Sequence, residues 1–118
     1  MCHTPMGPQG PDMARAFAGG NPMELPPMFG TGTLHPSNIT SDKATGIGSW
    51  SEADLIKAVK TATRPDGRPI QGPMQFYTHG WSQLTDEDAQ ALAAFVKSIP
   101  PVANKVPAST FKPAGPPG

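Results

Sequence analysis

The chain is short of the residues from which proteins build cross-links and large cores. It has one cysteine in 118 residues, which excludes an internal disulfide bond. Leu, Ile, Val and Phe together supply 19 residues, which is below the roughly 20% that usually supports a packed core. No apolar run approaches the ~20 residues that a helix needs to span a bilayer. An ordinary enzyme domain with a large core is therefore not expected.

The chain also lacks an excess of charge of either sign, because nine basic residues balance nine acidic ones. Binding of nucleic acid normally requires a basic stripe that neutralises phosphates, so no nucleic-acid partner is expected. A disordered chain usually combines weak hydrophobicity with strong net charge, and this chain has only the first property. The composition is thus compatible with a folded domain.

Proline and glycine are abundant instead, at 16 and 13 residues. Residues 19–36 are especially rich in both and indicate an extended, turning loop. Few apolar side chains and long loops together fit a small domain whose apolar centre is partly supplied by something other than side chains. We predict one domain over residues 1–100 and a Pro-rich tail or linker over residues 101–118.

Two helices are predicted, and both are amphipathic. The first begins near Ser49, where Ser49 and Glu52 match a capping box, and ends before Pro65. The second follows Thr85 as N-cap, has an acidic first turn that suits the helix dipole, and ends at Pro100. A short helical turn is expected over residues 12–17 and a loop over residues 68–84. Phe95 is expected in the core.

Cys2 and His3 are the first residues that could carry chemistry. A cysteine directly before a histidine forms the second half of the haem-attachment motif Cys-x-x-Cys-His, in which thiols add to haem vinyl groups and the imidazole reaches the iron. The same pair also occurs by chance as a free thiol beside a surface imidazole. The pair alone therefore leaves both interpretations open.

Met74 is the second candidate, because a thioether is a soft ligand that can fill the sixth position of a haem iron. It follows Pro73 in the predicted loop, where the fixed φ of proline would hold it. A loop methionine more often fills a packing gap, and Met6, Met13, Met23 and Met28 are competitors. His35 and His79 are further loop residues that could join Cys2, His3 and methionines in a copper site.

Nothing in the sequence matches a catalytic constellation. There is no Gly-rich phosphate loop, no Gly-x-Ser-x-Gly and no His-Glu-x-x-His motif. The acidic cluster at residues 86–88 is explained by its place in the first turn of a helix. We therefore do not expect an enzyme.

Taken together, the motifs resemble class I c-type cytochromes, specifically the haem domains of bacterial cytochrome c subunits of membrane-associated dehydrogenases. The resemblance lies in an ordered series over residues 2–107: Cys2-His3-Thr4-Pro5, Ala16-Phe17-Ala18-Gly19-Gly20, Ser37-Asn38-Ile39-Thr40, Thr45-Gly46-Ile47-Gly48-Ser49-Trp50-Ser51, Arg64-Pro65-Asp66-Gly67-Arg68, Gly72-Pro73-Met74, Leu84-Thr85-Asp86-Glu87-Asp88 and Ile99-Pro100-Pro101-Val102.

The resemblance implies an all-α, cytochrome c-like domain with long Pro/Gly-rich loops wrapped around a covalently bound haem c. Cys2 would form a thioether, His3 would be the proximal ligand of the iron and Met74 the distal one. Asn38 and Ile39 would lie against the haem edge, and Trp50 would sit near it. The first motif cysteine and the helix that precedes it in the family do not occur here, so we expect the sequence to be a piece of a longer chain.

The expected function is electron transfer, because both axial positions of the iron would be filled. The resemblance implies a dehydrogenase subunit as donor, a terminal oxidase or other acceptor in a respiratory chain, and a periplasmic or otherwise extracytoplasmic location. Membrane association would come through segments outside this sequence. The alternatives are a copper- or metal-binding module and a non-functional truncated fragment.

Overall fold

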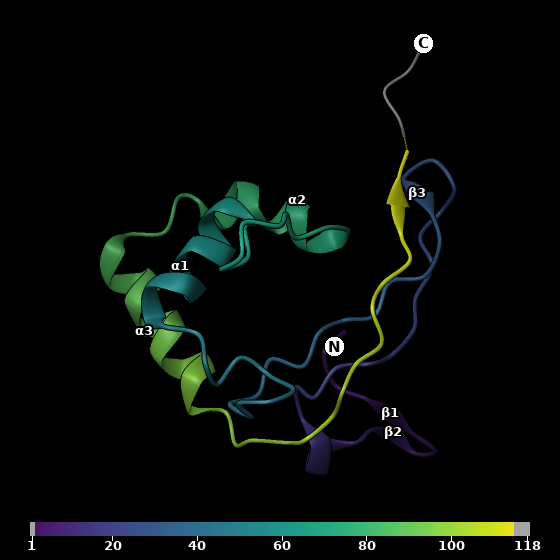
Figure 1. Cartoon of the computed structure of the whole chain (residues 1–118), viewed down its shortest axis with the longest axis horizontal. Coiled ribbons are helices and arrows are strands. Elements are labelled where there is room, and N and C mark those ends of the chain that lie inside the picture. Colours follow the sequence, from purple (N-terminus) through teal and green to yellow (C-terminus); the bar gives the residue numbers. More distant parts are fainter. Residues whose placement is uncertain (1, 115–118) are drawn as a thin grey trace.

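The computed structural model describes residues 2–114, and three α-helices dominate this part of the chain (Figure 1). They are α1 (Glu52–Thr61), α2 (Pro73–Trp81) and α3 (Asp86–Ser98). The other elements are short: the 3-10 helix η1 (Met13–Arg15) and four two-residue strands, β1 (Met6–Gly7), β2 (Gly10–Pro11), β3 (Gly30–Thr31) and β4 (Lys112–Pro113). The observed class is thus helical with long irregular connections.

The start of α1 corrects the expected capping box. The N-cap is Ser51, whose hydroxyl accepts from the Asp54 amide at 3.1 Å while the Asp54 carboxylate accepts from the Ser51 amide at 2.9 Å. Ser49 cannot serve, because the preceding residues are committed to a turn in which the Trp50 amide donates to the Ile47 carbonyl. The capping principle was correct, but the two-residue shift depends on a tertiary turn.

Helix α2 was missed by the sequence analysis, which placed a loop over residues 68–84. The helix has no side-chain cap, and its two start signals are Gly72 at the N-cap and Pro73 at the first helical position, where a missing N–H costs nothing. None of its residues is fully buried, and the most protected of them, such as Met74 and Trp81, are only half-buried, so the helix packs weakly on the rest of the domain. By contrast, α3 begins at the predicted N-cap Thr85, whose hydroxyl accepts from the Asp88 amide.

The core is small and lies where α1 packs against α3. Its buried members are Ile47, Leu55 and Ala93, with Ile39 and Trp50 among the partly buried side chains that pack on them. Phe95 does not belong to it: the side chain is 57% exposed, so its expected place in the core was wrong. The turn before α1 therefore contributes Ile47 and Trp50 to a core that is otherwise built mainly by the helices.

The chain after α3 runs back along the opposite side of the molecule (Figure 1). There β4 pairs with β3, and Phe111 is buried against Gly30 and Gly32, where a Cβ atom would leave no space. The Thr110 amide donates to the Thr33 carbonyl at 2.9 Å, and the Ser109 hydroxyl accepts from the His35 amide. We call residues 101–114 the C-terminal strap. This part of the Pro-rich tail is held by contacts with the domain.

Asp42, in the loop before α1, makes the stability of the fold depend on pH. The hydrogen bond from the Thr45 hydroxyl and then that from the Thr45 amide lower the pKa of the Asp42 carboxyl below its usual 3.8. A lowered pKa stabilises the fold above the unfolded-state pKa, and this stabilisation is lost as the pH falls through the folded-state pKa. We expect Asp42→Asn to lower the melting temperature at neutral pH, with a difference that shrinks below about pH 4. A pH series of thermal unfolding on both proteins measures it; a difference that stays constant with pH contradicts the assignment.

Candidate functional site

His3 is half-buried and is held at two points. Its ring Nδ1 lies 2.8 Å from the carbonyl oxygen of Ser37, and its own carbonyl accepts from the Gly19 amide at 2.6 Å. A carbonyl oxygen can only accept, so Nδ1 carries the proton and donates. The second ring nitrogen, Nε2, then keeps a free lone pair. This is the tautomer in which histidine binds a metal, with a backbone carbonyl orienting the ring.

Two backbone groups anchor His3, the Gly19 amide and the Ser37 carbonyl, and Gly19 allows them to lie close together. Its φ of +74° is in the left-handed region, and a Cβ atom at this position would lie 2.4 Å from the Pro36 carbonyl oxygen and 2.5 Å from the Ser37 carbonyl carbon. Both clashes are with backbone, which cannot move away. Only glycine therefore allows the turn at residue 19 to approach the Pro36–Ser37 peptide this closely.

Met74 lies in the first turn of α2 and not in a loop, which corrects the sequence-based placement. Its side chain is half-buried, and Pro73, which was expected to hold it in a loop, instead occupies the first helical position. Gly72, directly before the helix, has the Leu34 side chain against it: a Cβ atom there would lie 2.8 Å from Leu34 Cδ1. Residues 34–37 thus contact the start of α2 through Leu34 and the His3 ring through Ser37.

The arrangement of the ribbon agrees with these contacts. In Figure 1 the N-terminal end of the chain lies inside the curve that the ribbon forms, with α2 on one side and the C-terminal strap on another. The molecule is flat, with extents of 44 × 38 × 24 Å. Cys2, next to His3, has an exposed and unpaired thiol.

The remaining predicted site residues divide into two groups. Ile39 and Trp50 come together on the core cluster beside Ile47. Asn38 is 3% exposed, and protein groups use its hydrogen-bonding capacity: its oxygen accepts from the Thr40 amide and hydroxyl, and its NH₂ lies within donating distance of Thr45 Oγ1 and of the Val102 and Asn104 carbonyls. Asn38 therefore joins the loop to the C-terminal strap.

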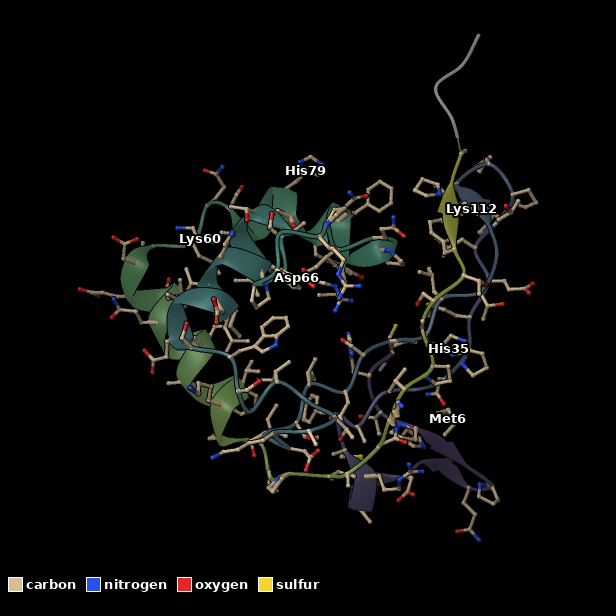
Figure 2. All side chains as sticks on the ribbon, viewed as in Figure 1. Met6, His35, Lys60, Asp66, His79 and Lys112 are labelled. Carbon is tan, nitrogen blue, oxygen red and sulfur yellow. The ribbon has the colours of Figure 1, made fainter. Side chains whose placement is uncertain are left out.

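The histidines proposed for the alternative copper site do not lie close together. Figure 2 shows His79 on the outer side of α2 and His35 beside the C-terminal strap, in different parts of the molecule. Within residues 2–114, no group of three or more His, Cys, Asp or Glu side chains is arranged to hold a metal ion. This geometry gives no support to a copper site of that kind.

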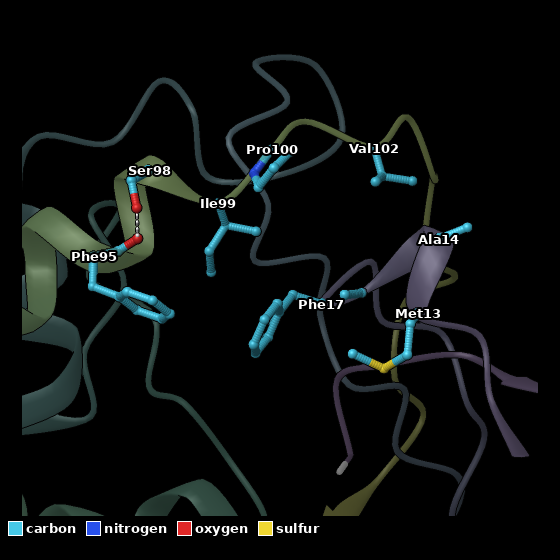
Figure 3. Close-up of a pocket in the computed structure, with 9 residues that line it drawn as sticks. Met13, Ala14, Phe17, Phe95, Ser98, Ile99, Pro100 and Val102 are labelled. Atoms are coloured by element: carbon cyan, nitrogen blue, oxygen red, sulfur yellow. Dashed lines mark hydrogen bonds between the residues drawn. The ribbon is translucent and has the colours of Figure 1, made fainter.

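A cavity of about 250 Å³ lies between the C-terminal end of α3 and η1 (Figure 3). Phe17, Phe95 and Ile99 are among its apolar lining residues. Its volume is below the ~300–1,000 Å³ of typical small-molecule sites. Of the candidate ligands only Met13, a competitor of Met74, lines it, whereas Cys2, His3 and Met74 do not. We therefore place the candidate site at His3 and Met74 and not in this cavity.

Sequence reasoning missed the groups that orient His3. The Ser37 carbonyl is a backbone atom and leaves no signal in the sequence. Asn104, whose NH₂ lies 2.9 Å from the Ala18 carbonyl and 3.4 Å from the Gly19 carbonyl, is in the segment expected to be a linker. Gly19 and Gly20 were noted only as a helix end, although the signal of a positive φ was present in the glycine pair.

Comparison with known proteins gives several relatives that align with most of this chain. The chain is 38% identical over 103 residues to the gluconate 2-dehydrogenase cytochrome c subunit of Pantoea cypripedii, which covers 86% of this chain and 21% of that protein. It is 35% identical over 103 residues to the cytochrome c subunit of the quinone-dependent alcohol dehydrogenase of Komagataeibacter europaeus, covering 86% and 19%. It is 35% identical over 102 residues to a diheme cytochrome c-type protein of Cereibacter sphaeroides, covering 86% and 31%.

The chain thus spans less than a third of the length of each of these relatives. No protein-family model matches it. Within residues 2–114, none of the helices has the length and apolar character needed to cross a membrane.

Proposed function

Because the chain resembles cytochrome c subunits of bacterial dehydrogenases over most of its length, we propose that it is an electron-transfer domain that holds haem c between His3 and Met74. The observation that carries the proposal is the hydrogen bond from His3 Nδ1 to the Ser37 carbonyl, which leaves Nε2 as a ligand. An imidazole with one nitrogen fixed by a carbonyl is the usual form of a histidine that binds iron.

Cys2 and Met74 also fit a bound haem c. The exposed Cys2 thiol is free to form a thioether next to the His3 ligand. Met74 supplies a soft sulfur from the first turn of α2, and Leu34, packed on Gly72, connects that turn to the segment that holds His3. Imidazole and thioether are the axial pair that raises the reduction potential of a haem iron.

When bound, the haem supplies an iron that takes up and releases one electron. His3 and Met74 would both hold the iron, and the work of the chain would be to keep these two side chains in place, so that no position is left open for a substrate. His3 is fixed by two hydrogen bonds, and Ile39 and Trp50 add apolar surface within the core cluster. A domain of this kind relays electrons and does not itself transform a substrate.

The names of two relatives support a dehydrogenase subunit as the proposed donor. We take a terminal oxidase or another respiratory component as the acceptor because the motif resemblance implies one. An extracytoplasmic location, most simply the periplasm, follows for a domain with covalent haem c.

The absorption spectrum tests this function. We expect the protein, produced in cells that mature c-type cytochromes, to carry covalent haem and to show the sharp bands of a six-coordinate iron in the reduced state. It should bind carbon monoxide weakly, because both axial positions are occupied. A protein that carries no haem under these conditions, although its relatives in the same cells do, contradicts the proposal.

A further inference from the structure

Asn104 lies in the C-terminal strap, and its side chain contacts the turn beside His3. Its side-chain NH₂ lies 2.9 Å from the Ala18 carbonyl oxygen and 3.4 Å from that of Gly19, which are more than 80 residues earlier in the chain. Ala18 is 0% exposed, so its carbonyl has no access to water. The amide of Asn104 is therefore the polar partner that this buried turn requires.

The turn held by Asn104 is one of the two anchors of His3. The Gly19 amide donates to the His3 carbonyl at 2.6 Å, and the next amide, that of Gly20, donates to the Pro36 carbonyl at 2.8 Å. The turn thus fixes the backbone of His3 on one side. On the other side it fixes the peptide between Pro36 and Ser37. The carbonyl of Ser37 in turn accepts from the His3 ring.

The backbone of Asn104 contacts the second anchor. Its carbonyl lies 3.2 Å from the NH₂ of Asn38, the residue that follows Ser37. Its amide donates to Thr45 Oγ1 at 3.0 Å, and this hydroxyl also lies 3.2 Å from the Asn38 NH₂. One residue thus bonds to both segments that orient the His3 imidazole.

We infer that Asn104 is a positioning residue for His3: it sets the distance between the residue 18–19 turn and the Ser37–Asn38 peptide, and through them the orientation of the imidazole toward the iron. The inference rests on the proposed function. It assigns to the C-terminal strap a role in tuning the proximal ligand, in addition to its packing on residues 29–35.

The experiment compares Asn104→Ala and the similarly shaped Asn104→Asp with Ser109→Ala. Ser109 lies in the same strap and accepts a single hydrogen bond, from the His35 amide, so its removal tests the strap without touching the His3 anchors. The midpoint potential of the haem-loaded protein is measured for all three, together with amide hydrogen exchange at Gly19 and at Ala93 in the core.

We expect both Asn104 variants to shift the potential and to speed exchange at Gly19 by about tenfold, the effect of losing one hydrogen bond, with exchange at Ala93 unchanged. Ser109→Ala should leave the potential as in the wild type. Equal effects on Gly19 and Ala93 with an unchanged potential would mean that Asn104 acts on stability alone, and would overturn the inference.

One measurement needs no variant and decides the matter if the Asn104 variants do not fold. In the wild-type protein, the side-chain NH₂ protons of Asn104 should exchange at least about tenfold more slowly than those of the exposed Gln90. Equal rates would overturn the inference. A wild-type protein without haem c would instead overturn the proposed function itself, so the two failures are distinguishable.

Discussion

Replacement of His3 by alanine is expected to reduce the fraction of chains that carry correctly ligated haem by at least about 100-fold. Loss of an outer partner that only orients a histidine ligand typically costs 10–100-fold in metal affinity, and loss of the ligand itself must cost more. The substitution also removes the ring that bonds to the Ser37 carbonyl, so this carbonyl loses its partner as well. Haem content per chain and the spectrum of the reduced protein measure the effect.

His79→Ala is the matched control for this experiment. His79 is exposed on the outer side of α2, and it lies in the same helix as Met74 (Figure 2). The control should keep the wild-type haem content and spectrum. A His3→Ala protein with the wild-type spectrum, or an equal loss in both variants, would show that His3 is not the proximal ligand.

Replacement of Met74 by alanine is expected to keep the haem but to change its electronic properties. In the proposed site, the thioether at Cys2 and the His3 ligand would remain, while the Met74 sulfur would be lost and one position on the iron would become open. Axial ligands set the reduction potential of haem over a range of roughly 0.8 V. We expect the potential of this variant to fall by at least about a tenth of that range. Carbon monoxide and cyanide should then bind readily. A redox titration and a ligand titration measure the two effects.

Met28→Ala controls for the loss of any methionine, since Met28 is 77% exposed and lies in the loop before β3. It should leave the potential and ligand binding unchanged. If Met74→Ala kept the wild-type potential and stayed closed to cyanide, another residue would have to be the distal ligand, even with His3 confirmed as the proximal one.

The sequence predicted those parts of the fold that depend on local signals. Helix α3 begins at Thr85 as expected, because the cap, the acidic first turn and the apolar period all agree over neighbouring residues. The start of α1 was wrong by two residues because a turn from Ile47 to Trp50 decides it. Helix α2 was missed because a glycine and a proline stand at its start, where they are typical of a loop, and because no side chain caps it.

The sequence alone suggests the side chains of the candidate site but not the groups that hold them. A cysteine–histidine pair and a methionine after proline are readable from sequence, because the chemistry requires those residue types. The partner of His3 is a backbone carbonyl, and the residues that hold that carbonyl lie far along the chain. Spacing in a single sequence contains no information on such contacts, so Gly19 and Asn104 became evident only from their distances in the structure.

The pairing of the C-terminal strap with residues 29–35 has a consequence for the order in which the protein folds. Contacts that join residues more than 70 positions apart require a large loop to close before they contribute, which makes folding slow. A ribosome releases the strap after residues 2–100, so a nascent chain that still lacks residues 104–114 cannot yet form the hydrogen bonds from the strap to the residue 18–19 turn and to His35. The imidazole would then reach its final orientation only after synthesis of this region is complete.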